Sequence, residues 1–212
     1  MKWSRRITSV AVAILVLGVA AVPWAQRRSG ADDDERARLA ELLRIQPGST
    51  IADVGAGDGD FALAFAESVG EAGRVFATEI SESNLSRIRA AVTREKRSNV
   101  TVIEVTEDDA RLPEACCDAI YLRNVYHHLT RPKATVDSLF RAMKPGALLA
   151  IIDFEPSGRR VDGVPENRGG HGVRPALVAE ELAASGFREV QRIPRWRGND
   201  YLILFEKPAA SR

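Results

Sequence analysis

The sequence predicts an α/β fold in which helices cover both faces of a doubly wound, mostly parallel seven-stranded sheet, closed by an antiparallel C-terminal hairpin. Two observations predict this fold. Short apolar runs alternate with helical patterns five times, which is typical of a parallel sheet buried on both faces. Two strand-like runs then follow each other at the C-terminal end, so the alternation breaks there, and we expect the last strand to insert antiparallel.

Strands are predicted where short apolar runs lie between turn-forming residues. The seven predicted strands are residues 50–54, 74–79, 100–105, 119–122, 147–154, 188–193 and 201–207. The fifth reads as wholly apolar, which places it in the middle of the sheet. The turn around Gly198 and Asn199 joins the last two strands into the hairpin.

Helices are predicted where apolar residues recur at helical spacing. The predicted helices are residues 32–44 with acidic residues in the first turn, 61–69, a segment capped by Ser81, a segment that starts at 130–132 and stops at 144–146, and 175–185 closed by Gly186. Each of them connects two strands or, for the first, precedes the sheet.

The N-terminal segment has the pattern of a signal peptide or an uncleaved signal anchor, because a basic start at residues 2–6 precedes an apolar run at 7–24. We therefore predict a leader at 1–26, one globular domain at 27–207 and a tail at 208–212. Basic residues on the short side favour a cytoplasmic N-terminus, so the domain is expected to be exported to the periplasm or anchored to a membrane. An anchor with a cytoplasmic domain is the alternative. If uncleaved, the leader makes the membrane a partner.

Composition narrows the class of partner. The 212 residues are 45% hydrophobic and 28% charged, which is the balance of a folded globular protein. The formal net charge is +1, so no nucleic-acid partner is expected. The two cysteines, Cys116 and Cys117, are neighbours in sequence and are expected to pack rather than to form a disulfide.

A glycine-rich turn directly follows the first strand. Gly55 and Gly57 allow a tight turn and a close approach of ligand atoms to the backbone. A pyrophosphate-binding turn has a third glycine at the position that Asp60 occupies here. The acidic residues at 58 and 60 would also repel a phosphate group. They suit a ligand that carries an ammonium and a sulfonium. Glu79 ends the second strand, where a carboxylate can accept hydrogen bonds from both hydroxyls of a ribose.

These features resemble the class I S-adenosylmethionine-dependent methyltransferases over residues 33–207. The segment 53–59 resembles their first motif, Glu79 their ribose-binding acid, 109–110 their adenine-contacting pair, and 139–146 their helix-to-strand-five element. The resemblance implies a Rossmann-like fold, the cofactor S-adenosylmethionine and methyl transfer. With the loop after strand four, the cofactor-binding residues expected are Asp53, Gly55, Ala56, Gly57, Glu79, Asp109, Ala110 and Asn124.

The methyl acceptor is expected to be a small molecule, because the chain adds no separate recognition domain. Protein or lipid acceptors at a membrane surface stay open. Two alternatives are a non-catalytic module that keeps the cofactor pocket and, less favoured because of Asp60, a nicotinamide-dependent oxidoreductase.

The chain has three histidines, and all of them follow strands four and five. His127 and His128 are the predicted catalytic residues, as general bases, and the alternative is that they only shape their loop. Tyr126 and His171 are predicted to line the substrate pocket. Three histidines could also bind a metal if they converge, but the sequence predicts no metal site.

Residues 155–174 form a long, glycine- and arginine-rich loop that is expected to act as a lid. As part of a lid, Arg159 and Arg168 would hold an anionic substrate. The alternative is that its arginines are simply solvated charges.

Overall fold

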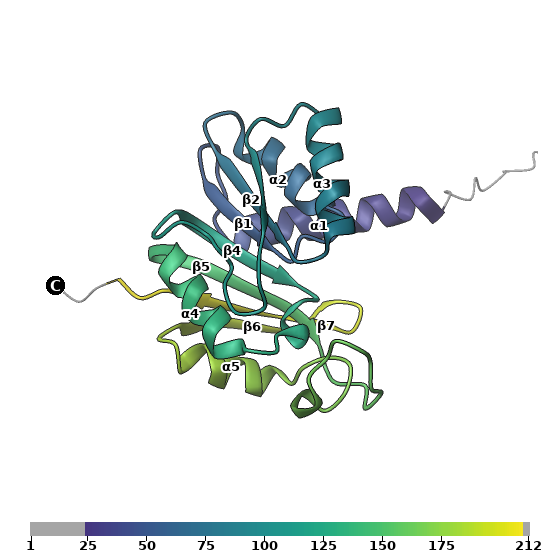
Figure 1. Ribbon diagram of the computed structural model, residues 1–212, viewed down its shortest axis with the longest axis vertical. Coiled ribbons are helices and arrows are strands. Elements are labelled where there is room, and N and C mark those ends of the chain that lie inside the picture. The colour runs from purple at the N-terminus through teal and green to yellow at the C-terminus, as the bar shows by residue number, and fades with distance from the viewer. Residues whose placement is uncertain (1–23, 210–212) are drawn as a thin grey trace, which may run out of the picture.

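The computed structural model describes residues 24–209, which contain one seven-stranded sheet and five α-helices (Figure 1). The strands are β1 (Thr50–Val54), β2 (Arg74–Glu79), β3 (Val100–Glu104), β4 (Cys117–Arg123), β5 (Met143–Phe154), β6 (Arg188–Arg197) and β7 (Asp200–Glu206). The α-helices are α1 (Trp24–Leu42), α2 (Asp60–Val69), α3 (Glu82–Arg94), α4 (Pro132–Ala142) and α5 (Pro175–Ala183). Two short 3-10 helices are η1 (Tyr126–His128) and η2 (Glu166–Arg168).

The strand order is β3-β2-β1-β4-β5-β7-β6. Strands β1 to β5 pair in parallel, and β7 lies antiparallel between β5 and β6. This confirms the predicted sheet and its C-terminal hairpin. Because β1 is paired in parallel with both β2 and β4, the carboxyl ends of these central strands meet at one edge of the sheet. The strand order reverses between β1 and β4, since β2 and β3 are added on one side of β1 and the later strands on the other.

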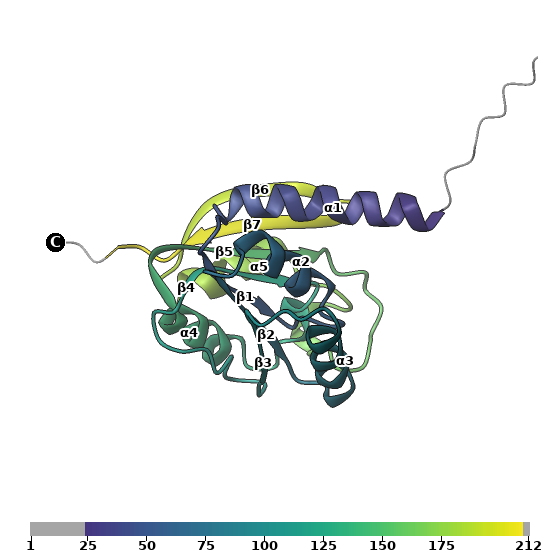
Figure 2. The same cartoon turned by 90° about the horizontal axis from the view of Figure 1, so that it is seen from above.

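Helices cover both faces of the sheet, and each face has its own apolar core (Figure 2). Helices α1, α2 and α3 contribute to one core with side chains such as Leu39, Phe65 and Ile88, all fully or almost fully buried. Helices α4 and α5 contribute to the other with Leu139 and Leu182. The central strands are buried on both sides, which explains why they read as continuous apolar runs.

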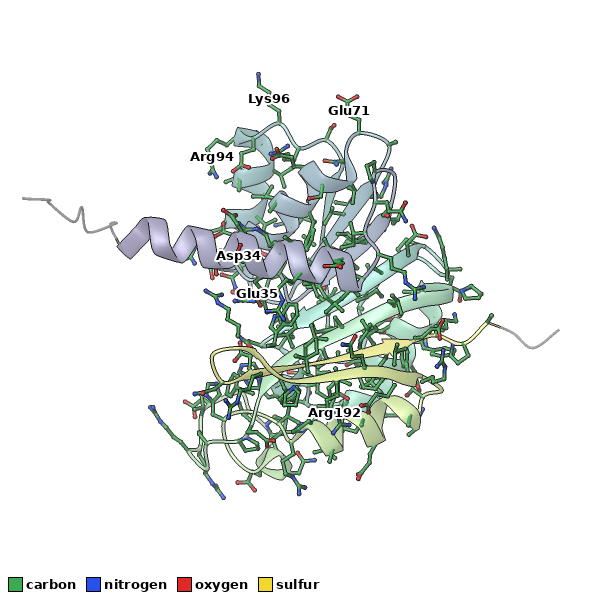
Figure 3. The ribbon with its side chains drawn as sticks, turned by 180° about the vertical axis from the view of Figure 1, so that it is seen from behind. Asp34, Glu35, Glu71, Arg94, Lys96 and Arg192 are labelled. Atoms are coloured by element: carbon green, nitrogen blue, oxygen red, sulfur yellow. The ribbon has the colours of Figure 1, made fainter. Side chains whose placement is uncertain are left out.

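The first helix differs from its prediction. It was expected at 32–44 with an acidic first turn, but α1 begins at Trp24, eight residues earlier, and crosses the predicted boundary between leader and domain. The acidic residues lie in the body of the helix, where Asp33 pairs with Arg36 one turn away. Viewed from behind, α1 runs across the near face of the sheet, above the β6–β7 hairpin (Figure 3).

The predicted leader lies almost entirely outside the described residues, as does most of the predicted tail. None of the helices within residues 24–209 has both the length and the apolar character that a bilayer-spanning helix needs.

Other elements have different ends from those predicted. Strand β4 begins at Cys117 and β5 at Met143, because these residues pair with each other before a shift in register. The residues predicted to stop α4 therefore belong to β5. Ser81 stands at the N-cap of α3, but its hydroxyl bonds Ser83 and not the helix backbone.

Candidate active site

The turn between β1 and α2 is held by close contacts on both sides. Gly55 and Gly57 have φ of 75° and 59°, a region that residues with side chains disfavour. A Cβ on Gly55 would lie 2.5 Å from Val125 Cγ2, so the loop after β4 packs directly on this glycine. The N–H groups of Gly55 and Ala56 both donate to the Thr78 carbonyl, at 3.0 and 2.9 Å, which ties the turn to β2.

Glu79, at the end of β2, has its carboxylate fixed by backbone donors. Oε2 accepts a hydrogen bond from the N–H of Gly57 at 2.9 Å. Oε1 accepts from the N–H groups of Ile80 and Ser81 at 2.8 and 3.0 Å. Asn84 Nδ2 also donates to Oε2, at the long distance of 3.4 Å. A carboxylate has about four acceptor positions, so a ligand hydroxyl can bind Glu79 by taking the place of this weak side-chain donor.

A cavity of about 460 Å³ opens at the carboxyl ends of β1 to β4, where open α/β sheets bind ligands. Its volume falls in the range of small-molecule sites. Five of the residues predicted to bind the cofactor line this cavity: Gly55, Gly57, Glu79, Ala110 and Asn124.

The other three predicted cofactor residues do not line the cavity. Asp53 is buried in β1, where burial raises the pKa of its carboxyl to about 7. Ala56 packs into the core below the turn. Asp109 accepts a hydrogen bond from the N–H of Arg111 at 2.8 Å, so its carboxylate holds its own loop. These side chains shape the backbone of the site rather than its surface.

Asn124 has the feature expected of a ligand-binding residue. It adopts a φ of 57°, and its own N–H donates to the Ile152 carbonyl at 2.8 Å. Its side-chain Oδ1 is buried and has no hydrogen-bond partner within the protein. Buried polar atoms are usually paired, so an orphaned acceptor on the cavity wall fits a ligand that brings a donor.

Sequence reasoning missed several residues of the wall. Ile80 follows Glu79 and leaves 57% of its surface exposed, although it is a large apolar residue. Leu129 and Thr130 follow η1, and the Thr130 hydroxyl donates to the Glu107 carboxylate at 2.7 Å. Each of these residues comes just after an element that ends at the ligand edge, and that position was the signal available in the sequence.

The three histidines lie together beside this cavity, as the sequence predicted. Their candidate ligand atoms are all within 4.8 Å of one another, so the cluster could hold a metal ion. Among them, His128 lines the cavity, whereas His127 is buried behind it and His171 lies in the loop after β5. Of the two predicted catalytic residues, His128 therefore reaches the cavity wall and His127 does not.

A buried acid supports His127. Asp153 Oδ1 lies 2.9 Å from His127 Nδ1, and Oδ2 accepts from the His127 N–H at 3.1 Å. Asp153 is completely buried in β5, a strand predicted as wholly apolar. The sequence signal was the one acidic residue inside that apolar run.

Tyr126 and Arg168 are not pocket residues, contrary to the prediction. Both are buried, and both bind Glu181 of α5: the Tyr126 hydroxyl donates at 2.8 Å and Arg168 Nη1 donates at 2.9 Å. Arg168 Nη2 also donates to the Leu129 carbonyl at 3.2 Å. A desolvated guanidinium needs such partners, so Arg168 fixes the long loop to the core and cannot meet a substrate.

The loop 155–174 contains η2 and is tied across itself by the His171 N–H, which donates to the Arg159 carbonyl at 2.7 Å. Arg159 itself is exposed and lies outside the cavity wall. Its predicted contact with an anionic substrate stays a prediction.

The sheet order with its antiparallel β7, the glycine turn leading into α2 and the acid that ends β2 together define the class I S-adenosylmethionine-dependent methyltransferase fold. A family model described as "Methyltransferase domain" matches residues 52–151. Residues 52–151 are thus a methyltransferase domain, and the fold around them is that of the class I S-adenosylmethionine-dependent methyltransferases.

Similar proteins agree with this class. The ubiquinone/menaquinone biosynthesis C-methyltransferase UbiE of Hydrogenovibrio crunogenus is 30% identical over 115 residues, which is 54% of this chain and 45% of that protein. The match thus spans less than half of the relative. A SAM-dependent methyltransferase from Aquifex aeolicus superimposes with a TM-score of 0.69 at 26% identity, covering 82% of this chain and 89% of the other. Phosphoethanolamine N-methyltransferase 2 of Haemonchus contortus, solved with S-adenosyl-L-methionine, gives 0.67 at 16% identity over 83% and 52%, a likeness of fold alone.

Proposed function

We propose that this chain binds S-adenosylmethionine in the cavity at the carboxyl ends of β1 to β4 and transfers its methyl group to a small-molecule acceptor. The observation that carries the proposal is the Glu79 carboxylate, which three backbone N–H groups fix on the wall of a cavity of suitable size. A fixed acceptor needs no reordering when a ligand binds, and this lowers the cost of binding.

Each wall residue has a role in this proposal. Glu79 would accept hydrogen bonds from the ribose hydroxyls, and the orphaned Asn124 Oδ1 would accept one from another donor of the cofactor. Gly57 lets the ligand approach the backbone. When bound, the cofactor supplies a methyl group that is already electrophilic, so the protein's main task is to orient the acceptor.

A small, largely apolar acceptor fits the walls best. Ile80, Val125 and Leu129 line the cavity with apolar side chains. The relatives named as quinone-biosynthesis C-methyltransferases favour a small aromatic acceptor. His128 is the imidazole on the wall, where it would accept a proton from a protonated acceptor group.

The dinucleotide alternative is less well supported by the start of α2. Asp60 is its first residue and Asp58 lies just before it. Burial and then the charge of Asp58 raise the pKa of Asp60, as expected where acidic groups crowd together. A pyrophosphate placed here would meet like charge instead of a free helix N-terminus.

Titration calorimetry of S-adenosylmethionine into the full-length chain tests the proposal. We expect saturable binding at one site, weakened roughly 10- to 100-fold in Glu79→Gln, because a hydrogen bond to a charged group contributes about 1.5–3 kcal/mol. The matched control is Glu82→Gln, an exposed acid in the first turn of α3 that should bind like the wild type.

Two results would contradict the proposal. One is a folded wild-type chain that does not bind the cofactor. The other is saturable binding of a nicotinamide dinucleotide in its place. Cofactor binding without turnover of small aromatic acceptors would support the alternative of a non-catalytic module.

A further inference from the structure

The three histidines form a cluster that the proposed methyl transfer does not explain. The chain contains only three histidines, and the fold brings all of them together from η1 and the loop after β5. The ring centroid of His127 lies 4.1 Å from the ring centroid of His128 and 4.9 Å from that of His171. The three rings therefore form one cluster.

His127 is oriented as a metal ligand is. Its Nδ1 faces the Asp153 carboxylate at 2.9 Å, which makes Nδ1 the protonated nitrogen and leaves a lone pair on Nε2. The side chain is 1% exposed, and Nε2 has no hydrogen-bond partner in the described part of the chain. A carboxylate behind a histidine is the usual support of a metal-binding imidazole.

His128 repeats this arrangement with a backbone acceptor. Its Nδ1 lies 3.0 Å from the Gly163 carbonyl, so Nδ1 donates and Nε2 keeps its lone pair. His127 and His128 therefore each present an Nε2 lone pair, which metal binding requires.

We propose that His127, His128 and His171 form a binding site for one divalent transition-metal ion, with Zn²⁺ as the reference ion. Three nitrogen ligands with a fourth position open to water are typical of catalytic zinc sites. Imidazole ligands also suit other transition metals but not Mg²⁺ or Ca²⁺. The site revises the expectation from sequence that no metal binds.

The geometry needs a small contraction when the ion binds. Zinc–nitrogen bonds of about 2.0–2.1 Å place the nitrogen atoms of tetrahedral ligands about 3.4 Å apart. In this structure the candidate ligand atoms of the three histidines lie within 4.8 Å of one another. His128 is exposed and His171 partly so. Glycines on both sides of His171, Gly170 and Gly172, have positive φ. These two rings can move toward His127, which stays fixed by Asp153.

The position of the site suggests a role that rests on the proposed function. His128 belongs to both the cluster and the cavity wall, so an ion bound there would lie at the rim of the cavity. Its open position would take an oxygen of the acceptor, such as a phenol, and lower the pKa of that hydroxyl. With the ion bound, His128 Nε2 has no free lone pair, so the ion would replace His128 as the group that activates the acceptor. Metal binding itself requires neither cofactor nor turnover.

The test is titration of Zn²⁺ into the untagged full-length chain, together with the visible absorption of bound Co²⁺. We expect one ion per chain, a tetrahedral Co²⁺ spectrum, and at least tenfold weaker binding in His128→Gln and His171→Gln. Asp153→Asn should weaken binding by about 10- to 100-fold, as loss of a supporting carboxylate does. Because His128 and His171 are not fully buried, their variants should fold, and circular dichroism checks this.

The matched control is Cys116→Ser, because Cys116 is the partly exposed thiol that could bind zinc elsewhere. This variant should bind the ion like the wild type. The inference is overturned if the wild type binds no stoichiometric ion, if the two histidine variants bind it equally well, or if Cys116→Ser abolishes binding. A chain that binds S-adenosylmethionine but no metal would overturn this inference alone and leave the proposed function intact.

Discussion

The carboxyl group of Asp53 lies in β1, just before the glycine turn, and is shielded from water. It is 3% exposed, and burial raises its pKa from 3.8 to about 7. As pH rises from about 4 to 7, the unfolded chain releases this proton and the folded chain keeps it. The free energy of unfolding therefore falls over this window, and the stabilisation present at low pH is lost as pH passes the folded pKa.

We predict that Asp53→Asn removes this fall. One pKa unit corresponds to about 1.4 kcal/mol, so the variant should gain about 4 kcal/mol over the wild type between pH 4 and 8. Urea unfolding at a series of pH values measures the difference. Asp162→Asn, in the exposed loop, is the control and should follow the wild type. Parallel curves for wild type and Asp53→Asn would contradict the prediction.

At the scale of single residues, the sequence predicted well those residues whose role depends on the local backbone. Gly55 and Gly57 could be assigned because their spacing and the following helix are local properties. Glu79 could be assigned because the end of a strand is visible in the sequence. The burial of Arg168 could not be predicted, since it depends on Glu181 and Tyr126, which only tertiary packing brings to it.

At the scale of elements, a buried acid of α1 binds two strands of the sheet. Glu35 is 3% exposed and accepts hydrogen bonds from Arg123 of β4 and from Trp196 and Arg197 of β6. Burial raises its pKa, but the hydrogen bonds from Arg123 and Trp196 outweigh this and hold the pKa of Glu35 below its usual value. Figure 3 labels Glu35 next to the exposed Asp34 on the same helix.

We predict that Glu35→Ala lowers the free energy of unfolding by roughly 3 kcal/mol, because it leaves Arg123 and a buried indole N–H without their partner and leaves Arg197 with Asp32 alone. Asp34→Ala should change it by less than about 0.5 kcal/mol, as exposed substitutions do. Chemical denaturation of both variants makes the comparison. Equal stabilities of the two variants would show that the Glu35 contacts do not stabilise the fold.

The ends of elements were predicted best where a local signal fixed them. Pro132 set the start of α4, and the bounds of β1 and β2 agree with the prediction. The start of α1 was missed because acidic residues such as Asp33 looked like a first turn but pair with residues one turn away inside the helix. The start of β5 was missed because its pairing with Cys117 depends on another strand.

At the scale of the whole molecule, ligand binding should appear as thermal stability. If the cofactor binds only the folded chain, a concentration of 100 times Kd adds about 2.7 kcal/mol. For a domain of this size we predict that Tm then rises by roughly 5–10 °C. Differential scanning fluorimetry measures this rise, and a nicotinamide dinucleotide at the same concentration is the control that should leave Tm unchanged. A rise with the dinucleotide alone would contradict the proposed cofactor.

The sheet order could be predicted because alternation of strands and helices constrains it strongly. The meeting of three histidines could only be anticipated in outline. Their approach depends on how the loop after β5 folds back, and Arg168 fixes that loop through a contact 13 residues away in the chain.

The attachment of α1 also determines an order of events during synthesis. Glu35 and its partner Trp196 are 161 residues apart, so the contacts between α1 and β6 cannot form until β6 has left the ribosome. Long-range contacts of this kind form late and slow folding. While the rest of the sheet is being translated, α1 is therefore not yet docked on β6.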